Sequence, residues 1–168
     1  MFEPSSLLPK QKKPYRAFLA RRGETPFSRS NEDEEEAELL RTAPKNSFEI
    51  LDRLKPRIAP KYNLFLFPVY NEFGKNAALV FHHLVVKIYG EHLQEMILSI
   101  RRETCIYIQV FHEEEHLRPK KGEAMITRIE IVKGKALEEY FLEMEEVMKA
   151  YAAKLSKWVQ PAALQEPV

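Results

Sequence analysis

The stretch from Gly134 to Val159 constrains the fold of this chain more than any other; it reads GKALEEYFLEMEEVMKAYAAKLSKWV. Its apolar residues recur in alternating steps of four and three, which places them on one face of a single long helix. Glutamate and lysine occupy the opposite face. The sequence therefore predicts an amphipathic C-terminal helix with one continuous apolar stripe, made of Leu137, Phe141, Met144, Met148, Tyr151, Leu155 and Trp158.

Two shorter helices are predicted upstream of the long one. The first begins at the N-cap residues Asn46 and Ser47 and ends before Pro56. Its apolar face comprises Phe48, Ile50, Leu51 and Leu54. The second covers residues 93–102, because its apolar residues repeat at helical spacing and basic residues occupy its last turn, where they suit the helix dipole.

Four strands are predicted from runs of β-branched and aromatic residues, at 62–70, 77–89, 104–111 and 123–133. Pro68 cannot donate a ladder hydrogen bond, so the first strand is placed at an edge of the sheet. Gly90 is expected to end the second strand. The predicted fold class is α+β, with an antiparallel sheet of about four strands flanked by helices in the order α-β-β-α-β-β-α.

The first 45 residues are predicted to form a separate tail. They hold five of the eleven prolines and show no sustained helical or strand period, so they have little surface to bury. Basic residues dominate through Arg29, and an acidic run follows from Glu32 to Glu38. Opposite charges attract, so in an alternative to a fully extended tail the acidic run folds back on the basic arm. The predicted organisation is a disordered tail over 1–45, a single α+β domain over 46–160 and a short C-terminal tail over 161–168.

Composition excludes several classes of protein. The 26 lysines and arginines nearly balance the 25 aspartates and glutamates, so no overall charge attracts nucleic acid or an anionic membrane. The single cysteine, Cys105, cannot form an internal disulfide, which fits a reducing compartment. No apolar run approaches the ~18 residues of a membrane span. We therefore expect a cytoplasmic protein with no membrane partner and, lacking a glycine-rich phosphate loop, no nucleotide cofactor.

The string HEEEH at residues 112–116 matches the HExxH pattern of zinc metalloproteases. That chemistry requires a helix, which brings both imidazoles onto one metal ion. The string instead follows the strand-like run CIYIQVF and precedes Pro119, so a solvated loop is predicted. His112 and His116 are the weakest site candidates, no metal is predicted, and a zinc-dependent hydrolase is the least favoured function.

Non-enzymatic binding is the predicted function, as a protein-binding adaptor or chaperone-like module. The apolar stripe is about 32 Å long at 1.5 Å per residue, longer than a four-stranded sheet is expected to cover. Its distal residues Tyr151, Leu155 and Trp158 are therefore predicted to form a partner-binding surface, with a second copy of the chain as the partner. In the alternative, the same residues cover the predicted helix at 46–55.

Binding of single-stranded nucleic acid is the alternative function. Aromatic residues in the strands can stack on bases, and a basic arm can contact phosphates. Aromatic residues in strands more often lie in the core, however, and charges of the two signs cancel from Asn46 onward, so a protein partner is preferred. The basic arm consists of Lys10, Lys12, Lys13, Arg16, Arg21 and Arg22.

The order of predicted elements over residues 46–159 resembles that of small dimeric α+β adaptors such as class I secretion chaperones, in which helices flank an antiparallel sheet. The resemblance rests on element order rather than on signature residues, and it implies a fold rather than a function. The proline-rich first 45 residues are an addition that such chaperones do not need.

Overall fold

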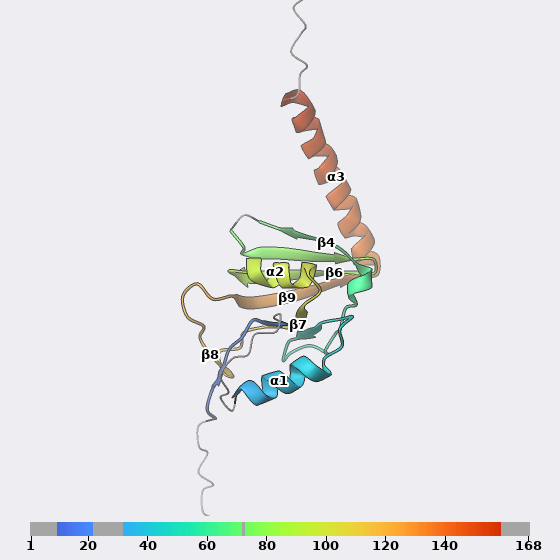
Figure 1. Cartoon of the computed structure of the whole chain (residues 1–168). Coiled ribbons are helices and arrows are strands. Elements are labelled where there is room, and N and C mark those ends of the chain that lie inside the picture. The colour runs from blue at the N-terminus through green and yellow to red at the C-terminus, as the bar shows by residue number, and fades with distance from the viewer. Residues whose placement is uncertain (1–9, 22–31, 72, 159–168) are drawn as a thin grey trace, which may run out of the picture.

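The computed structural model describes residues 10–21, 32–71 and 73–158, and it confirms the α+β class (Figure 1). The helices are α1 (Glu32–Thr42), α2 (Gln94–Arg101) and α3 (Lys135–Trp158), with a short 3-10 helix, η1 (Tyr62–Leu64). The strands are β1 (Lys13–Pro14), β2 (Phe18–Ala20), β3 (Glu49–Leu51), β4 (Phe65–Tyr70), β5 (Asn76–Phe81), β6 (Leu84–Glu91), β7 (Cys105–Gln109), β8 (His116–Leu117) and β9 (Met125–Lys133). None of the helices in these ranges is long and apolar enough to cross a membrane.

A four-stranded antiparallel sheet in the order β4-β5-β6-β9 organises the domain. The edge position predicted for the strand that contains Pro68 is confirmed, because β4 has a neighbour on one side only. The run predicted as one strand over 77–89 is two strands, since the chain turns at His82 and His83 between β5 and β6. The strand predicted over 104–111 does not belong to this sheet.

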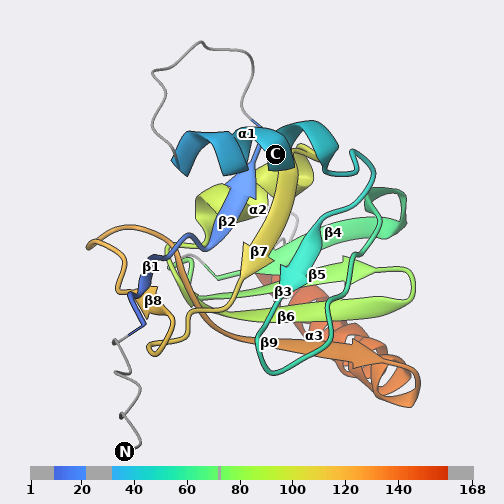
Figure 2. The same ribbon diagram turned by 90° about the horizontal axis from the view of Figure 1, so that it is seen from below.

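That strand, β7, is the centre of a second sheet in the order β2-β7-β3, visible side by side in Figure 2. It pairs antiparallel with β2 and parallel with β3. The main core lies between the inner face of the large sheet, α2 and this small sheet. Its largest fully buried side chains include Phe48, Phe81, Leu79, Ile88, Met96, Ile100, Ile108 and Ile129.

The helix predicted over 46–55 is wrong, because Glu49–Leu51 forms β3. Burial alternates along this segment, with Phe48 and Ile50 in the core. Leu54, which the helical pattern placed beside Phe48, is 80% exposed. A short run of apolar residues fits both the helical and the strand period. The parallel pairing with β7 and the bridge from Ile50 to Ile58 decide in favour of a strand.

Part of the segment predicted as a tail contributes to the packed domain. Ala17 and Leu19 are buried, and β2 pairs with β7. The first helix within the described ranges lies in the acidic run, as α1, instead of at 46–55. A strand of three residues is too short to show a period in sequence, and its pairing partner is distant, so local patterns did not reveal it. Residues 1–9 and 22–31 of this segment lie outside the described ranges.

Gly90 does not end its strand as predicted. β6 continues to Glu91, with a register shift between Tyr89 and Gly90 opposite β9. A Cβ atom at this position would lie 2.0 Å from the carbonyl oxygen of Met125. This distance is far shorter than any van der Waals contact, so no residue with a Cβ fits here. Glycine is therefore required for the close approach of two backbones and not for a break in the strand.

Candidate functional site

The beginning of α3 anchors this helix on the outer face of the large sheet. Leu137 is buried against Val80 and Val85, and Tyr140 and Phe141 pack beside them. This small cluster lies on the face of the sheet opposite the main core, so α2 and α3 cover opposite faces. Figure 1 shows the remainder of α3 leaving the sheet and extending away from the domain.

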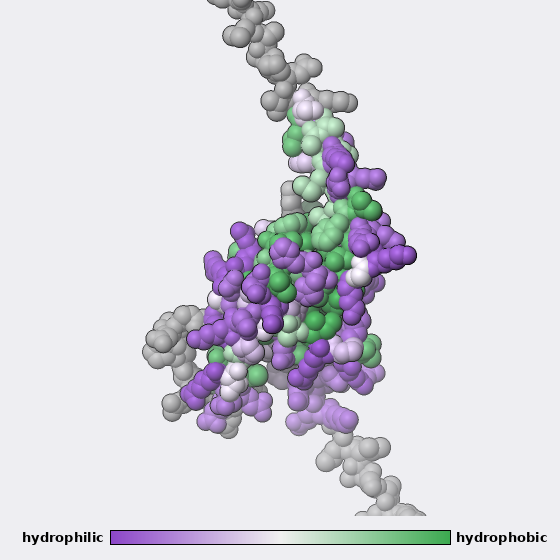
Figure 3. Space-filling model, turned by 90° about the vertical axis from the view of Figure 1, so that its right-hand side faces the viewer, coloured by the Kyte–Doolittle hydropathy of each residue, from purple (hydrophilic) through white to green (hydrophobic). Residues whose placement is uncertain are grey.

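The distal part of α3 presents apolar side chains to solvent. Met148 is 66%, Tyr151 65% and Leu155 49% exposed. Figure 3 shows hydrophobic residues continuing from the body of the domain along this helix. The overhang expected from the length of the stripe is therefore present, and Tyr151 and Leu155 lie on it. The side chain of Trp158, the third predicted member, lies outside those that the structure describes.

The intramolecular alternative for this stripe is not formed. Phe48 and Ile50, which the distal helix was to cover, are buried in the main core by other residues. Leu54, the third residue that the distal helix was to cover, is exposed. The distal stripe therefore does not pack on residues 46–55 of its own chain.

The basic arm is partly neutralised by the acidic helix. Arg16 Nη1 lies 2.6 Å from a carboxylate oxygen of Glu36 on α1. Arg21 Nη2 donates to the carbonyl oxygens of Ala43 at 2.7 Å and Pro44 at 3.2 Å, just beyond the end of α1. These contacts reproduce the fold-back of the acidic run on the arm. Of the other arm residues, Lys10, Lys12 and Lys13 are exposed, and Arg22 lies outside the described ranges.

The strand aromatics divide between the core and the surface. Phe81 is fully buried, and the ring of Tyr89 is covered by the guanidinium of Arg128 at 4.1 Å. Phe67, Tyr70 and Phe73, by contrast, are exposed along β4 and the hairpin that follows it. The exposed strand aromatics that the structure describes therefore gather along β4 and its hairpin.

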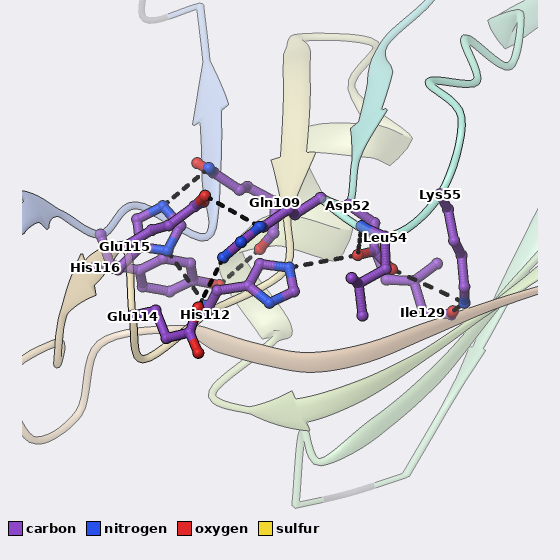
Figure 4. Close-up of polar contacts among 11 residues, drawn as sticks. Asp52, Leu54, Lys55, Gln109, His112, Glu114, Glu115, His116 and Ile129 are labelled. Atoms are coloured by element: carbon purple, nitrogen blue, oxygen red, sulfur yellow. Dashed lines mark hydrogen bonds and ion pairs between the residues drawn. The ribbon is translucent and has the colours of Figure 1, made fainter.

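The two candidate zinc ligands flank the turn at residues 113–115 instead of lying on a helix: His112 precedes the turn and His116 is the first residue of β8 (Figure 4). His112 Nε2 lies 3.3 Å from a carboxylate oxygen of Asp52. The backbone N–H of His112 donates to Nδ1 of His116 at 3.2 Å, and the Gln109 side chain lies 3.0 Å from Nε2 of His116. The two rings thus face different partners. No group of three potential metal ligands gathers anywhere in the described ranges.

These partners of the two histidines were not predicted from the sequence. Tyr15, from the N-terminal segment, donates its hydroxyl to the carbonyl of Gln109 at 2.7 Å and accepts from the backbone N–H of Ile126 at 2.9 Å. Its ring also packs at 5.3 Å from that of His116. The cluster joins segments that are far apart in the chain, and no local spacing signals such a contact.

Cys105 has the environment of a core residue and not of a nucleophile. It is fully buried in β7, as expected for a small apolar side chain. Burial raises the pKa of the Cys105 thiol to about 12, because a thiolate there would lose its hydration. At neutral pH the group is therefore an unreactive thiol.

The stability of the protein is expected to fall as the pH drops below about 6.5, the ordinary pKa of histidine. Burial lowers the pKa of His116 in the folded chain, because imidazolium is poorly solvated there. Above pH 6.5 both states are neutral at this site. As the pH falls, the unfolded chain binds a proton that the folded chain does not, and the folded state loses stability until the folded pKa is reached.

Urea unfolding between pH 7.5 and 5.5 measures this slope. His116→Gln should reduce it, whereas His82→Gln, at an exposed position, should leave it unchanged. An identical slope in His116→Gln and the original chain contradicts the assignment.

Comparison of the chain with models of known protein families, with curated protein sequences and with solved structures finds no match. The function of the chain is therefore inferred from the chemistry of its own residues, at the exposed stripe of distal α3 and at residues 112–116. Of these two, residues 112–116 make polar contacts within the fold, although the buried Nε2 of His112 forms no hydrogen bond with any residue that the structure describes, whereas the stripe presents large apolar side chains to water.

Proposed function

We propose that this chain is a non-enzymatic protein-binding module of the adaptor or chaperone type, which acts in the cytoplasm as a homodimer joined through α3. The observation that supports the proposal is the exposed stripe on distal α3, with Met148, Tyr151 and Leu155 about half exposed or more. Soluble proteins seldom leave contiguous apolar surface of this kind uncovered. A two-fold pairing of identical surfaces is the commonest way of covering it.

The spacing of the stripe suits helix-helix pairing. From Phe141 to Leu155 the apolar residues alternate steps of three and four, which is the a/d pattern of a coiled coil. Charged residues flank the stripe, and Lys149 Nζ lies 2.7 Å from Glu145 on the same helix. A second α3 packed along this stripe would bury the a/d side chains of both copies and leave the charges in water.

The β4 edge of the large sheet is a poorer route to a dimer. The backbone N–H of Asn71 bonds to the carbonyl of Asn76 at 3.3 Å, so Asn71 faces β5. Residues alternate along a strand, and Pro68 therefore faces the open side. Because proline has no N–H and its ring projects toward an incoming strand, pairing of two β4 edges would lose a central hydrogen bond. This favours α3 as the dimer contact.

Leu155→Glu tests the dimer directly. A carboxylate forced into the apolar contact, once from each copy, should weaken dimerisation by about 3 kcal/mol or more, which is roughly a hundred-fold in the dissociation constant. Light scattering at tens of micromolar should report a dimer for the original chain and a monomer for the variant. Circular dichroism should show little loss of helix, because Leu155 makes no core contact in the single chain.

Ala153→Glu is the matched control, since Ala153 is exposed and lies off the a/d stripe of the same helix. It should remain dimeric. A monomeric original chain, or a Leu155→Glu variant that is still a dimer, would disprove the proposal.

A second candidate, binding of single-stranded nucleic acid, is favoured by one observation. Three exposed rings, those of Phe67, Tyr70 and Phe73, lie along β4 and its hairpin, and Lys75, two residues after Phe73, is also exposed. Affinity for an oligonucleotide that falls steeply with added salt would favour this candidate, because phosphate contacts release counterions. The α3 proposal predicts binding to protein with little dependence on salt.

A further inference from the structure

β9 is the other edge strand of the large sheet, and half of its open side is unpaired. Lys55 donates its ammonium to the carbonyl oxygen of Ile129, so the backbone of Ile129 points away from β6. Because backbone groups alternate along a strand, those of Ile131 and Lys133 point to the same open side. No backbone-backbone hydrogen bond reaches that side of residues 129–133 from any part of the chain that the structure describes.

The first half of the same edge is already paired. The N–H of Phe111 bonds to the carbonyl of Ile126 at 2.8 Å, and Val110 forms a parallel bridge with Ile126. Beyond Phe111 the chain turns away at residues 113–115, before β8. The segment 110–111 therefore pairs with β9 only near Ile126. Within the described ranges, no strand pairs with the open side of the C-terminal half of β9.

A cleft of about 310 Å³ borders this unpaired half. Its apolar walls come from β9 on one side and from the segment 50–58 on the other, a loop that turns at residues 53–55 and is closed by the bond from the N–H of Ile50 to the carbonyl of Ile58 at 2.7 Å. The volume corresponds to roughly ten water molecules in the liquid. The residues that line the cleft are Ile50, Asp52, Lys55, Pro56, Ile58, Ile129, Ile131 and Lys133.

The charges at the cleft favour an acidic partner. Lys133 is exposed, and no ion pair holds it within the described ranges. Lys55 has only a long contact of 3.8 Å with Asp52 in addition to its bond to Ile129. Asp52 is engaged within the fold, since one of its oxygens accepts from the N–H of Leu54 at 3.1 Å. The two lysines at the cleft thus favour acidic residues in an incoming segment.

We infer that the edge of β9 from Ile129 to Lys133 binds an extended acidic and apolar segment of a partner protein as an added strand. The segment hydrogen-bonds to the outward backbone groups, places an apolar side chain in the cleft and sets a carboxylate beside Lys133. Lys55 releases the Ile129 carbonyl when the strand arrives. This inference rests on the proposed protein-binding function and names the class of partner. β9 suits the role better than β4, whose outward-facing Pro68 obstructs strand addition.

A random heptapeptide library displayed on phage, selected against the full chain, supplies the probe. The selected peptides should alternate apolar residues with aspartate or glutamate. Their dissociation constants should rise ten-fold or more with Ile131→Pro, because proline removes the outward N–H and its ring occupies the open side. Ile131→Val keeps the donor and should change them less than two-fold. On peptide binding, the amide protons of Ile131 and Lys133 should exchange more slowly.

Lys133→Glu is the second variant, and it decides the matter if Ile131→Pro fails to fold. It reverses an exposed charge and should weaken the acidic peptides ten-fold or more. The inference is overturned if no peptide is selected, if both Ile131→Pro and Lys133→Glu bind as the original chain does, or if Leu155→Glu abolishes binding, which would place the peptides on α3. The inference is also overturned if the amides of Ile131 and Lys133 exchange slowly without peptide and this protection is lost when the protein is diluted. Such a result would mean that a second copy of the chain occupies the edge.

Light scattering separates this inference from the dimer proposal. Ile131→Pro and Lys133→Glu should remain dimers, because neither position lies on α3. A chain that is monomeric and still binds the peptides through β9 would overturn the dimer and support the added strand.

Discussion

Phe48→Ala is expected to lower the free energy of unfolding by about 3–5 kcal/mol, which is the usual effect of truncating a fully buried phenylalanine. Phe48 is 1% exposed. Its ring lies 5.6 Å from that of Tyr62 and 6.2 Å from that of Phe81, so the change leaves a cavity between β3, η1 and β5. Urea unfolding followed by circular dichroism measures the loss.

Leu54→Ala is the informative control for that experiment. The helical pattern placed Leu54 on the same buried face as Phe48, whereas the structure leaves it in the turn after β3 and exposed. The substitution should therefore change stability by no more than about 0.5 kcal/mol. Equal losses at the two positions would mean that residues 46–55 form the amphipathic helix after all.

Leu19→Asn is expected to destabilise the fold by about 4 kcal/mol, by removing a buried apolar side chain and burying an amide without partners. Leu19 is buried in β2, opposite Tyr107 of β7. The experiment asks whether residues before 46 are part of the cooperative unit. Chemical unfolding, followed by both far-ultraviolet and near-ultraviolet circular dichroism, should give one transition at a lower midpoint.

Lys12→Asn serves as the comparison for Leu19→Asn, because Lys12 belongs to the same segment but is exposed. It should leave the midpoint nearly unchanged. If both variants unfold like the original chain, the N-terminal segment does not stabilise the domain and the domain begins near residue 46.

The N-terminal segment also bears on the open edge of β9. Tyr15 holds the backbone of Ile126 through its hydroxyl, and Phe111 bonds to the carbonyl of the same residue. Both contacts fall on the first half of β9, while the edge from Ile129 onward faces the cleft. Residues that sequence analysis assigned to a tail therefore help to fix one half of the strand whose other half is proposed to bind a partner.

The sequence by itself determined the elements whose residues follow a long local pattern. The stripe from Leu137 onward continues for many turns, and α3 begins and ends within one residue of its predicted limits. β4 was placed at an edge by Pro68 alone, because a missing N–H excludes a central position wherever the strand lies. The α2 helix and the exposure of distal α3 follow in the same way from period and length.

The tertiary structure decided how short segments pair. Phe48 and Ile50 fit a helix or a strand until β7 lies beside them, and β2 has too few residues to carry any period. The open half of β9 and its cleft depend on where the chain leaves the strand after Phe111. Such features are set by hydrogen bonds and burial between residues that are distant in the chain. The free energy of these contacts exceeds local conformational preferences, and the spacing of residues within one segment does not reveal them.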